Sequence, residues 1–591
     1  MRRRVTQRSR CWHGSADRGV SLILVMLSML VLSVLAATIV FTARSETLAS
    51  YNFKLDTQAD YLAKAGIQQA INWFRSANYK GVDPTNASTY YNVADSGAPY
   101  HLYTSTTEPV TCKANCDHTG TGSSANVQLM GITGTGSSNY PSINNAAGTA
   151  VTTQFTDDLS GQSVLGDANN QGTFSISAVL LNYQTVNTGQ APLLTANAVE
   201  TWLITSRASW TGGSSGVVAT AEEQAIVQPI YNPTWGNALY GYCSVEMQGS
   251  SGVCTDAYNS AVGCYGDASA CSNKTAAGNC GTSLSNVIDS GAGVGANGFV
   301  SLGSNVVVDG NVSIGTNPTG GSACCTGSGC GFQGSSSSVA GQVVNGPNVS
   351  PPQFLPPKPW PTGSTDGWPV NLSNLVPPPI SLGNSQVATY PQNAGTGYPW
   401  PTTFPSGPIP GTGTSGFPQP CLTGGTCDGT ATNPYTLNVS SMGNNSKLQL
   451  MGGPDIYHPI YYDFDQLNFN NGDINVSGFV VINVKTTLDL GGQSVINPVS
   501  STNSSPELIQ INFTGTSLAV HGNGALCAII QAPNADVVFG GGGSGGYMVG
   551  AVQGKTLSFK GGYPIHYDIQ LNRTGGTLAV MTTTGYTRRR M

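Results

Sequence analysis

The sequence predicts a mainly β protein with one long N-terminal α-helix that is first transmembrane and then amphipathic. Glycine is abundant, with 76 of 591 residues, and only 9% of the residues are charged, against roughly 25% in an average soluble domain. Residues 20–41 carry no charge at all. A chain of this length indicates several folded regions. The composition favours turn-rich β structure and argues against a cytosolic helical enzyme.

Residues 1–19 form a basic leader with six arginines and one aspartate. The uncharged run 20–41 follows directly, and as a helix it spans about 33 Å, enough for a bilayer core of about 30 Å. Because the arginines precede the run, the positive-inside rule keeps the N-terminus cytoplasmic and exports everything after residue 41. The net charge of the whole chain is −6, so the exported part is acidic and no nucleic-acid partner is expected.

The helix is expected to continue to residue 77, so that 20–77 form a transmembrane span and an amphipathic extension. Apolar residues such as Leu48, Leu55 and Leu62 recur on one face with helical spacing, and no proline interrupts the segment.

The order of a basic leader, Gly19, Val20 and an apolar helix resembles the class III leader of type IV pilins and pseudopilins. The segment 58–74 is similar to the region after the span in PilX-type minor pilins. This resemblance implies that a prepilin peptidase cleaves between Gly19 and Val20 and that the helix then packs with other pilins or minor pilins. The residues expected in the resulting filament spine are Leu22, Leu24, Leu27, Leu48, Leu55 and Leu62. An uncleaved signal anchor is the alternative interpretation.

Leu24 is the main departure from the pilin pattern. It occupies the fifth position after the expected cleavage site, where major pilins carry a glutamate. The resemblance therefore implies a minor subunit.

Residues 78–235 are expected to form the head that packs on the helix. Two plausible strands, 198–210 and 217–229, are separated by a glycine-rich turn typical of a β-hairpin. This hairpin also resembles the last hairpin of PilX-type heads, so the region is predicted to be a pilin-like head.

Three segments of different composition follow the head. Residues 236–345 are rich in cysteine and glycine, and 346–420 are rich in proline and read as an extended linker or wrapping segment. A connecting segment, 421–444, precedes the last domain. Within the first of these segments, 300–317 read as three six-residue units with aligned valines and asparagines, the pattern of a β-solenoid rung, although a simple meander is also compatible with so few units.

Residues 445–573 are expected to form a C-terminal β-solenoid-like domain, followed by a tail, 574–591. The ordered motifs within 532–535, 550–552, 557–559 and 566–568 are similar to a β-rich domain of PilX-like and other bacterial surface proteins. Period-2 alternation predicts a core containing Val537, Phe539, Leu557, Phe559 and Ile565.

Known catalytic patterns are poorly matched. His566 and Asp568 with a serine suggest a triad, and 212–216 formally read G-x-S-x-G, but the strand-to-helix elbow of that motif is missing from the pattern. The sequence around 554–556 resembles the end of a P-loop but is followed by strand-like residues. The expectation is a protein without catalytic residues.

No metal or cofactor site is expected either. The six histidines show no metal-binding spacing, and three aspartates, Asp309, Asp463 and Asp465, lack the spacing of a calcium loop. Solvated turns are the simpler role for these side chains.

The cysteines indicate an oxidising compartment, because thirteen lie after the leader and none forms a C-x-x-C pair. Two close pairs are candidate disulfides, Cys112 with Cys116 and Cys421 with Cys427. Eight more cysteines form a cluster whose connectivity the sequence leaves open. Cys527, in an apolar strand, is expected to remain a buried thiol.

Together these patterns predict a non-enzymatic, PilX-like minor pilin that takes part in type IV pilus assembly at or near the filament tip. It would reside in the bacterial inner membrane, with a periplasmic C-terminus, and reach the cell surface in the pilus. A surface or glycan ligand is a further possible partner. The alternatives are a surface adhesin and a pseudopilin of a type II-like secretion system.

Overall fold

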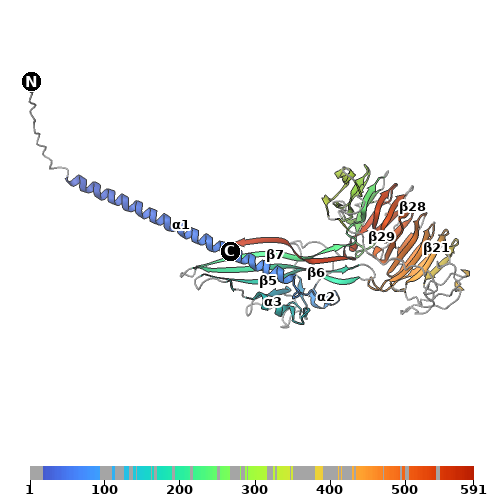
Figure 1. Ribbon diagram of the computed structural model, residues 1–591, viewed down its shortest axis with the longest axis horizontal. Helices are drawn as coiled ribbons and strands as arrows, with labels where there is room; N and C mark the ends of the chain where they lie inside the picture. The colour runs from blue at the N-terminus through green and yellow to red at the C-terminus, as the bar shows by residue number, and fades with distance from the viewer. Residues whose placement is uncertain are drawn as a thin grey trace, which may run out of the picture.

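A computed structural model of the chain describes the following residues: 18–92, 110–113, 126–131, 138–141, 143–160, 163–164, 170–189, 194–212, 217–248, 253–265, 280, 287–288, 291–315, 324–325, 329–346, 348–349, 380–390, 410–411, 414–415, 429–431, 434–469, 471–492, 495–498, 505–540 and 546–590. They form a long helix, a head sheet, and a stack of parallel strands (Figure 1).

Helix α1 (Arg18–Phe74) is one uninterrupted element of 57 residues, as expected from the absence of proline. Its N-terminal part projects away from the rest of the protein, whereas its C-terminal part lies along the head sheet (Figure 1). Two short helices, α2 (Pro84–Tyr90) and α3 (Val151–Leu159), flank the end of α1. The long helix predicted from the sequence is therefore confirmed, with its end three residues earlier.

The head is an antiparallel sheet with the strand order β3-β5-β6-β7-β32, to which β4 adds at β5. The predicted hairpin is confirmed, because both expected strands lie within β6 and β7. A two-stranded sheet of β1 and β2 adds to the head. The bounds are β1 (Tyr91–Asn92), β2 (Thr111–Cys112), β3 (Gln128–Met130), β4 (Ser163–Val164), β5 (Asn170–Thr188), β6 (Thr195–Gly212), β7 (Val217–Pro233) and β32 (Gly576–Arg590).

The last strand of the head comes from the C-terminus of the chain. Residues 574–591 were expected to be a tail, but β32 pairs antiparallel with β7 from Gly576 opposite Pro233 to Arg590 opposite Ala221. The whole segment between β7 and β32 is therefore an insertion in the head. Sequence spacing gives no sign of this pairing, because the two strands are more than 340 residues apart.

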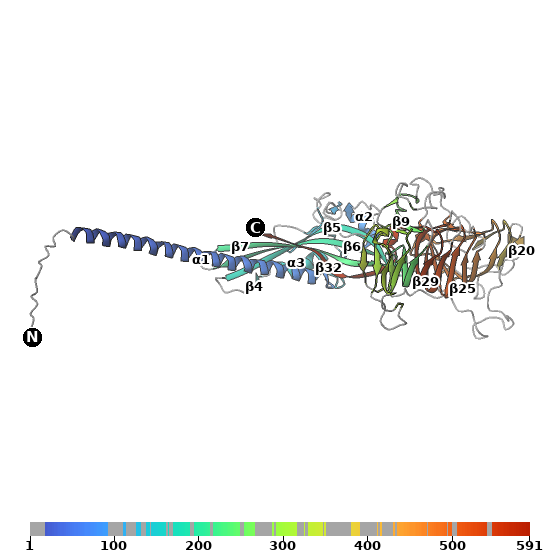
Figure 2. The same cartoon turned by 90° about the horizontal axis from the view of Figure 1, so that it is seen from above.

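The inserted segment is a stack of mostly parallel strands with one continuous core (Figure 2). Its strands are β8 (Leu239–Met247), β9 (Cys254–Tyr258), β10 (Val287–Ile288), β11 (Val294–Ala296), β12 (Phe299–Leu302), β13 (Val307–Val308), β14 (Val312–Ile314), β15 (Gly331–Gln333), β16 (Val343–Asn345), β17 (Ile380–Leu382), β18 (Val387–Tyr390), β21 (Tyr435–Met442), β22 (Lys447–Met451), β23 (Ile460–Phe469), β24 (Asp473–Ser477), β25 (Val480–Leu490), β26 (Val495–Pro498), β27 (Ile509–Phe513), β28 (Ser517–His521), β29 (Ala525–Gly540), β30 (Tyr547–Phe559) and β31 (Ile565–Asp568). The strand pairings form a closed sheet, in which β30, near the end of the segment, pairs with β8 at its beginning. The described residues also include three short 3₁₀ helices, η3 (Ser336–Ser338), η5 (Pro506–Leu508) and η6 (Ile569–Arg573), and the small pair β19 (Pro410–Gly411) and β20 (Thr414–Ser415).

The order of strands in the stack differs from their order in the chain. The chain enters at β8, and β11 and β12 pair on one side of it. The expected linker 346–420 is only partly correct, because β17 and β18 lie inside it and pair in parallel with β21 and β22 of the stack. From β17, successive parallel pairs lead back through β21, β23, β25, β27 and β29 to β30. Strand β30 then pairs in parallel with the other side of β8. The chain between β16 and β17 thus connects two series of strands that meet at β8 and β30.

The core of the stack follows the alternation expected from the sequence. Val537, Phe539, Leu557, Phe559 and Ile565 are all buried in it, as predicted. The apolar residues of the six-residue units are buried as well: Val300, Leu302, Val306, Val308, Val312 and Ile314.

The six-residue units form three consecutive strands that do not pair with one another directly. Strand β12 pairs with β8, β13 pairs with β9, and β14 pairs with β11, where Val312 lies beside Val294. The strand that follows β11, β12 and β13 therefore lies beside β11 again, so the chain returns to the same series of paired strands, here called a column, after three units.

Candidate functional site

Among the residues that the structure describes, the exposed large apolar side chains gather mainly in the first part of α1. Leu22, Leu24 and Leu27 each expose more than 60% of their surface, and the apolar side chains from Val20 to Phe41 are exposed throughout. Among the described residues, α1 is the helix long and apolar enough to cross a membrane, a property that signal sequences share. A surface of this size is not compatible with water as its only environment.

The six expected spine residues do not share one environment. Leu48 is exposed like the three leucines before it, whereas Leu55 and Leu62 are buried at 2% and 4% exposure. These two leucines pack in the head core together with aromatic residues of α1 and the sheet. Their assignment to an intermolecular spine is therefore wrong, because the head sheet already covers them.

Small residues bring the second half of α1 close to the sheet. Ala59, Ala63 and Ala70 are buried, and a Cβ atom at Gly66 would lie 2.3 Å from the Ser206 Oγ atom and 2.9 Å from the Phe174 ring. A larger residue at position 66 would push the helix away from the sheet. The orientation of the exposed half of α1 is thus fixed by packing in the head.

The predicted processing site lies at the start of the helix. The peptide bond between Gly19 and Val20 is in the first turn of α1, and no acidic side chain occurs from there to residue 45. Leu24 is one of the exposed residues of this segment.

A buried carboxylate ties the end of α1 to the head sheet. Glu200 on β6 accepts hydrogen bonds from the Tyr79 hydroxyl at 2.5 Å, the Val82 amide at 3.1 Å, and the Tyr140 hydroxyl and Trp202 Nε1 at 3.2 Å. Burial raises the pKa of Glu200 to about 7, although these donors oppose the shift. Glu200 and Trp202 are two residues apart on β6 and so share one face of the strand, whereas no sequence pattern indicated the two tyrosines.

A second buried polar cluster lies on the outer side of the stack, where β31 and β9 pair. His566 Nδ1 is 2.6 Å from Asp256 Oδ1, and the Tyr265 hydroxyl donates to Asp256 Oδ2 at 2.6 Å. The Tyr265 ring stacks on His566 with a centroid distance of 3.7 Å. Asp256 and His566 are nearly inaccessible, with 2% and 0% exposure. The candidate triad of His566 and Asp568 is replaced by this pair, because Asp568 instead accepts backbone hydrogen bonds from Ser260 and Gln570.

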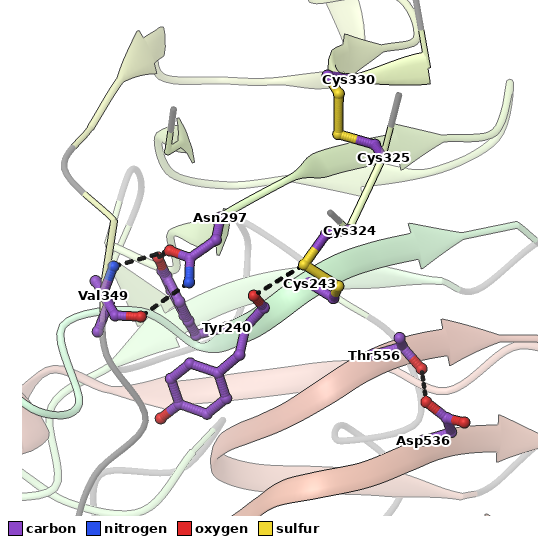
Figure 3. The surroundings of a disulfide bond; sticks show 10 residues. Tyr240, Cys243, Asn297, Cys324, Cys325, Cys330, Val349, Asp536 and Thr556 are labelled. Atoms are coloured by element: carbon purple, nitrogen blue, oxygen red, sulfur yellow. Dashed lines mark hydrogen bonds between the residues drawn. A yellow bond between two sulfur atoms is a disulfide. The ribbon is translucent and has the colours of Figure 1, made fainter. Parts of the chain in front are cut away.

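Three disulfides resolve part of the cysteine cluster. Cys243 is bonded to Cys324, Cys325 to Cys330, and Cys254 to Cys280. Figure 3 shows the first two, together with the hydrogen bonds by which Asn297 holds Tyr240 and the backbone of Val349. This connectivity could not be predicted from the sequence. The cysteines of the first disulfide are 81 residues apart and those of the third are 26 apart, so closeness in the chain would not have identified either pair.

The outcome for the other cysteines is mixed. Cys112 is disulfide-bonded, whereas its expected partner Cys116 and the pair Cys421 and Cys427 lie outside the described residues. Cys527 is buried and takes part in no disulfide, as expected.

The remaining sequence motifs fall in ordinary structural positions. Residues 554–556 lie within strand β30, so the P-loop geometry is not formed. Asp463 accepts a hydrogen bond from Asn483 at 2.7 Å, in a row of amide side chains across neighbouring strands. The motif at 212–216 lies mostly outside the described residues.

Comparison with known proteins supplies one partial match. Residues 460–574 match a family model described as a domain of unknown function (DUF7305). The match begins at β23 and ends just after η6, and so covers the later part of the series of strands that leads back to β8. No curated protein and no solved structure matches the chain.

Proposed function

We propose that the chain is a non-enzymatic, pilin-like minor subunit that takes part in type IV pilus assembly. The observation that carries the proposal is the division of α1 into an exposed apolar part and a part packed along an antiparallel head sheet. A helix of this kind anchors the subunit in the inner membrane before assembly and offers its apolar part to the helices of other pilins afterwards. The N-terminus is cytoplasmic and the C-terminus periplasmic in the membrane form.

Processing between Gly19 and Val20 by a prepilin peptidase precedes assembly in this proposal. Because Leu24 offers no carboxylate, the subunit lacks a partner for the terminal amine of a neighbour in the apolar interior. Burying an unpaired charge is costly. A low copy number in the filament follows.

The stack favours a place at or near the filament tip. It lies at the end of the head opposite the free part of α1 (Figures 1 and 2). We interpret it as a β-solenoid, since parallel strands recur in the same columns along one core. A repetitive lattice has little room for such a body beside every subunit, whereas a terminal position exposes it to a surface or glycan ligand.

Mass spectrometry of the N-terminus tests the proposal directly. The membrane form of the wild type is expected to begin at Val20, and Gly19→Val is expected to retain the leader, because a bulky residue replaces the glycine at the cleaved bond. Gly14→Val changes a leader glycine away from that bond and serves as the control, with normal processing expected. A wild-type membrane form that retains Met1 would overturn the class III assignment.

A further inference from the structure

Side chains of the types that bind metals come together on the outer side of the stack, where β9 and β31 pair, and most of them are buried there. Cys254 and Asp256 are two residues apart on β9, so their side chains leave the same face of the strand. His566 on β31 is the direct register partner of Asp256. Cys280 reaches this face through its bond to Cys254. Asp256, Cys280 and His566, from three separate parts of the sequence, therefore come together, and Cys254 is joined to this group through its bond to Cys280.

The spacing of these groups suits a small cation. In the described part of the chain, Asp256, Cys280 and His566 form the one group of at least three potential ligands whose ligand atoms lie within 4.8 Å of one another. Tetrahedral Zn²⁺ with ligand bonds of about 2.0–2.3 Å holds its ligand atoms about 3.4–3.8 Å apart. Binding would need the sulfur to move inward by about 1 Å and the 2.6 Å contact between Asp256 and His566 to open by a similar amount.

Tyr265 supplies the support that metal ligands usually need. Its hydroxyl donates to Asp256 Oδ2, whereas His566 contacts Asp256 Oδ1, and its ring stacks on the imidazole with an interplanar angle of 25°. Outer hydrogen bonds of this kind fix the orientation of ligands. The low exposure of Asp256 and His566 also keeps competing water away.

We propose that Cys254, Asp256, Cys280 and His566 form a zinc-class metal site that exists only when the Cys254–Cys280 disulfide is reduced. Thiolate is the sulfur form that binds metal strongly, and the disulfide removes both thiolates at once. The oxidised and the metal-bound forms are therefore mutually exclusive. Two thiolates, one carboxylate and one imidazole complete four-coordinate binding, and soft sulfur ligands with an imidazole favour Zn²⁺ over Mg²⁺ or Ca²⁺.

An external dithiol can convert the oxidised form into the metal-binding form by reducing the Cys254–Cys280 disulfide. Two electrons and two protons pass from the dithiol to the protein disulfide, giving two cysteine thiols, and the dithiol leaves as its own disulfide. Zn²⁺ then displaces the two thiol protons to solvent. His566 would bind through Nδ1, the ring nitrogen that lies beside Asp256 Oδ1.

The test measures Zn²⁺ retained by the full-length protein in detergent after dialysis. The wild type is expected to retain one more Zn²⁺ per chain after reduction with a phosphine than in the oxidised state, and Co²⁺ in its place is expected to show thiolate-to-metal charge-transfer absorption. Cys280→Ser and His566→Asn are each expected to abolish this difference. Tyr265→Phe is expected to weaken binding by about 10–100-fold through the loss of its hydrogen bond.

Cysteines elsewhere in the stack provide a control within the same molecule. Zn²⁺ is expected to slow alkylation of Cys254 and Cys280 in the reduced protein by at least about tenfold, and to leave the rates for Cys325 and Cys330 unchanged. The double variant Cys325→Ser/Cys330→Ser is expected to retain the additional Zn²⁺. Equal Zn²⁺ binding by the oxidised and reduced wild type, or equal protection of all four cysteines, would overturn the proposal. This measurement does not require His566 variants to fold.

Discussion

Phe559 lies where the two series of strands in the stack meet. Its ring is 1% exposed and stacks on Phe539 with a centroid distance of 4.5 Å and an interplanar angle of 8°. In the backbone register Phe559 lies beside Phe539 on β29 and beside Met247 on β8. Replacing it therefore removes packing on both sides of the junction.

Phe559→Ala is expected to lower the free energy of unfolding of the stack by about 4 kcal/mol. Deleting a fully buried phenylalanine side chain typically costs about 3–5 kcal/mol, and the stacked partner supports the upper half of that range. Phe559→Leu fills most of the space and is expected to cost about 2 kcal/mol or less. Val307→Ala, which removes methyl groups from a side chain that is 52% exposed, is expected to change stability by less than about 0.5 kcal/mol.

Limited proteolysis across a urea series is a suitable assay, because a chain with several folded regions does not unfold in one step. Fragments from the stack identified by mass spectrometry report its midpoint separately from that of the head. The expected order of midpoints is wild type and Val307→Ala together, then Phe559→Leu, then Phe559→Ala. If Phe559→Ala unfolds at the same urea concentration as Val307→Ala, Phe559 is not part of a tightly packed core and the assigned register at β30 is wrong.

Three further changes test the head and α1. Burial raises the pKa of Glu200 to about 7, so between pH 4.5 and 7 the folded head keeps a proton that the unfolded chain has lost. The free energy of unfolding of the head should therefore fall by about 3 kcal/mol as pH rises from 4.5 through 7. Urea titrations at several pH values measure this dependence, and Glu200→Gln should flatten it. Deleting 576–590 removes the strand paired with β7 and should make the head protease-sensitive while α1 remains membrane-bound, as fractionation would show; a head that keeps its resistance would contradict the assigned pairing. Leu24→Glu should raise the copy number in sheared filaments measured by quantitative proteomics, and an unchanged copy number would show that the missing carboxylate does not limit incorporation.

Local patterns in the sequence were sufficient for much of the secondary structure. The apolar run and the spacing after it predicted α1, and the glycine-rich turn predicted the β6–β7 hairpin, because both depend on residues near each other in the chain. The alternation around Phe539 and Phe559 also identified core positions correctly. In each case the pattern repeats over a few residues, and burial of one face determines it.

Pairing between distant segments was beyond these patterns. The contact of β8 with β30 joins residues about 310 apart, and the contact of His566 with Asp256 depends on the neighbouring pair β31–β9. A strand ladder is formed by backbone groups that every residue carries, so it leaves no signature in the sequence of one strand alone. Leu55 and Leu62 show the same limit, because helical spacing identifies an apolar face but not which surface covers it.

The insertion has a mechanical consequence for a subunit that joins a stack to a helix. The chain leaves the head after β7 and returns just before β32, and the two crossings are held together, since the Thr234 amide donates to the Gly575 carbonyl at 3.1 Å and the Tyr231 hydroxyl donates to the same carbonyl at 2.6 Å. Gly189, at the end of β5, exchanges two backbone hydrogen bonds with Gly576. A pull on the stack thus reaches β7 and β32 at one place, and β32 transmits it by shear along its hydrogen bonds to β7. The hydrogen bonds of this antiparallel pair are perpendicular to the strands and share a load applied along them. Because many of them must break together in this arrangement, the head resists extension at the point where the stack joins it.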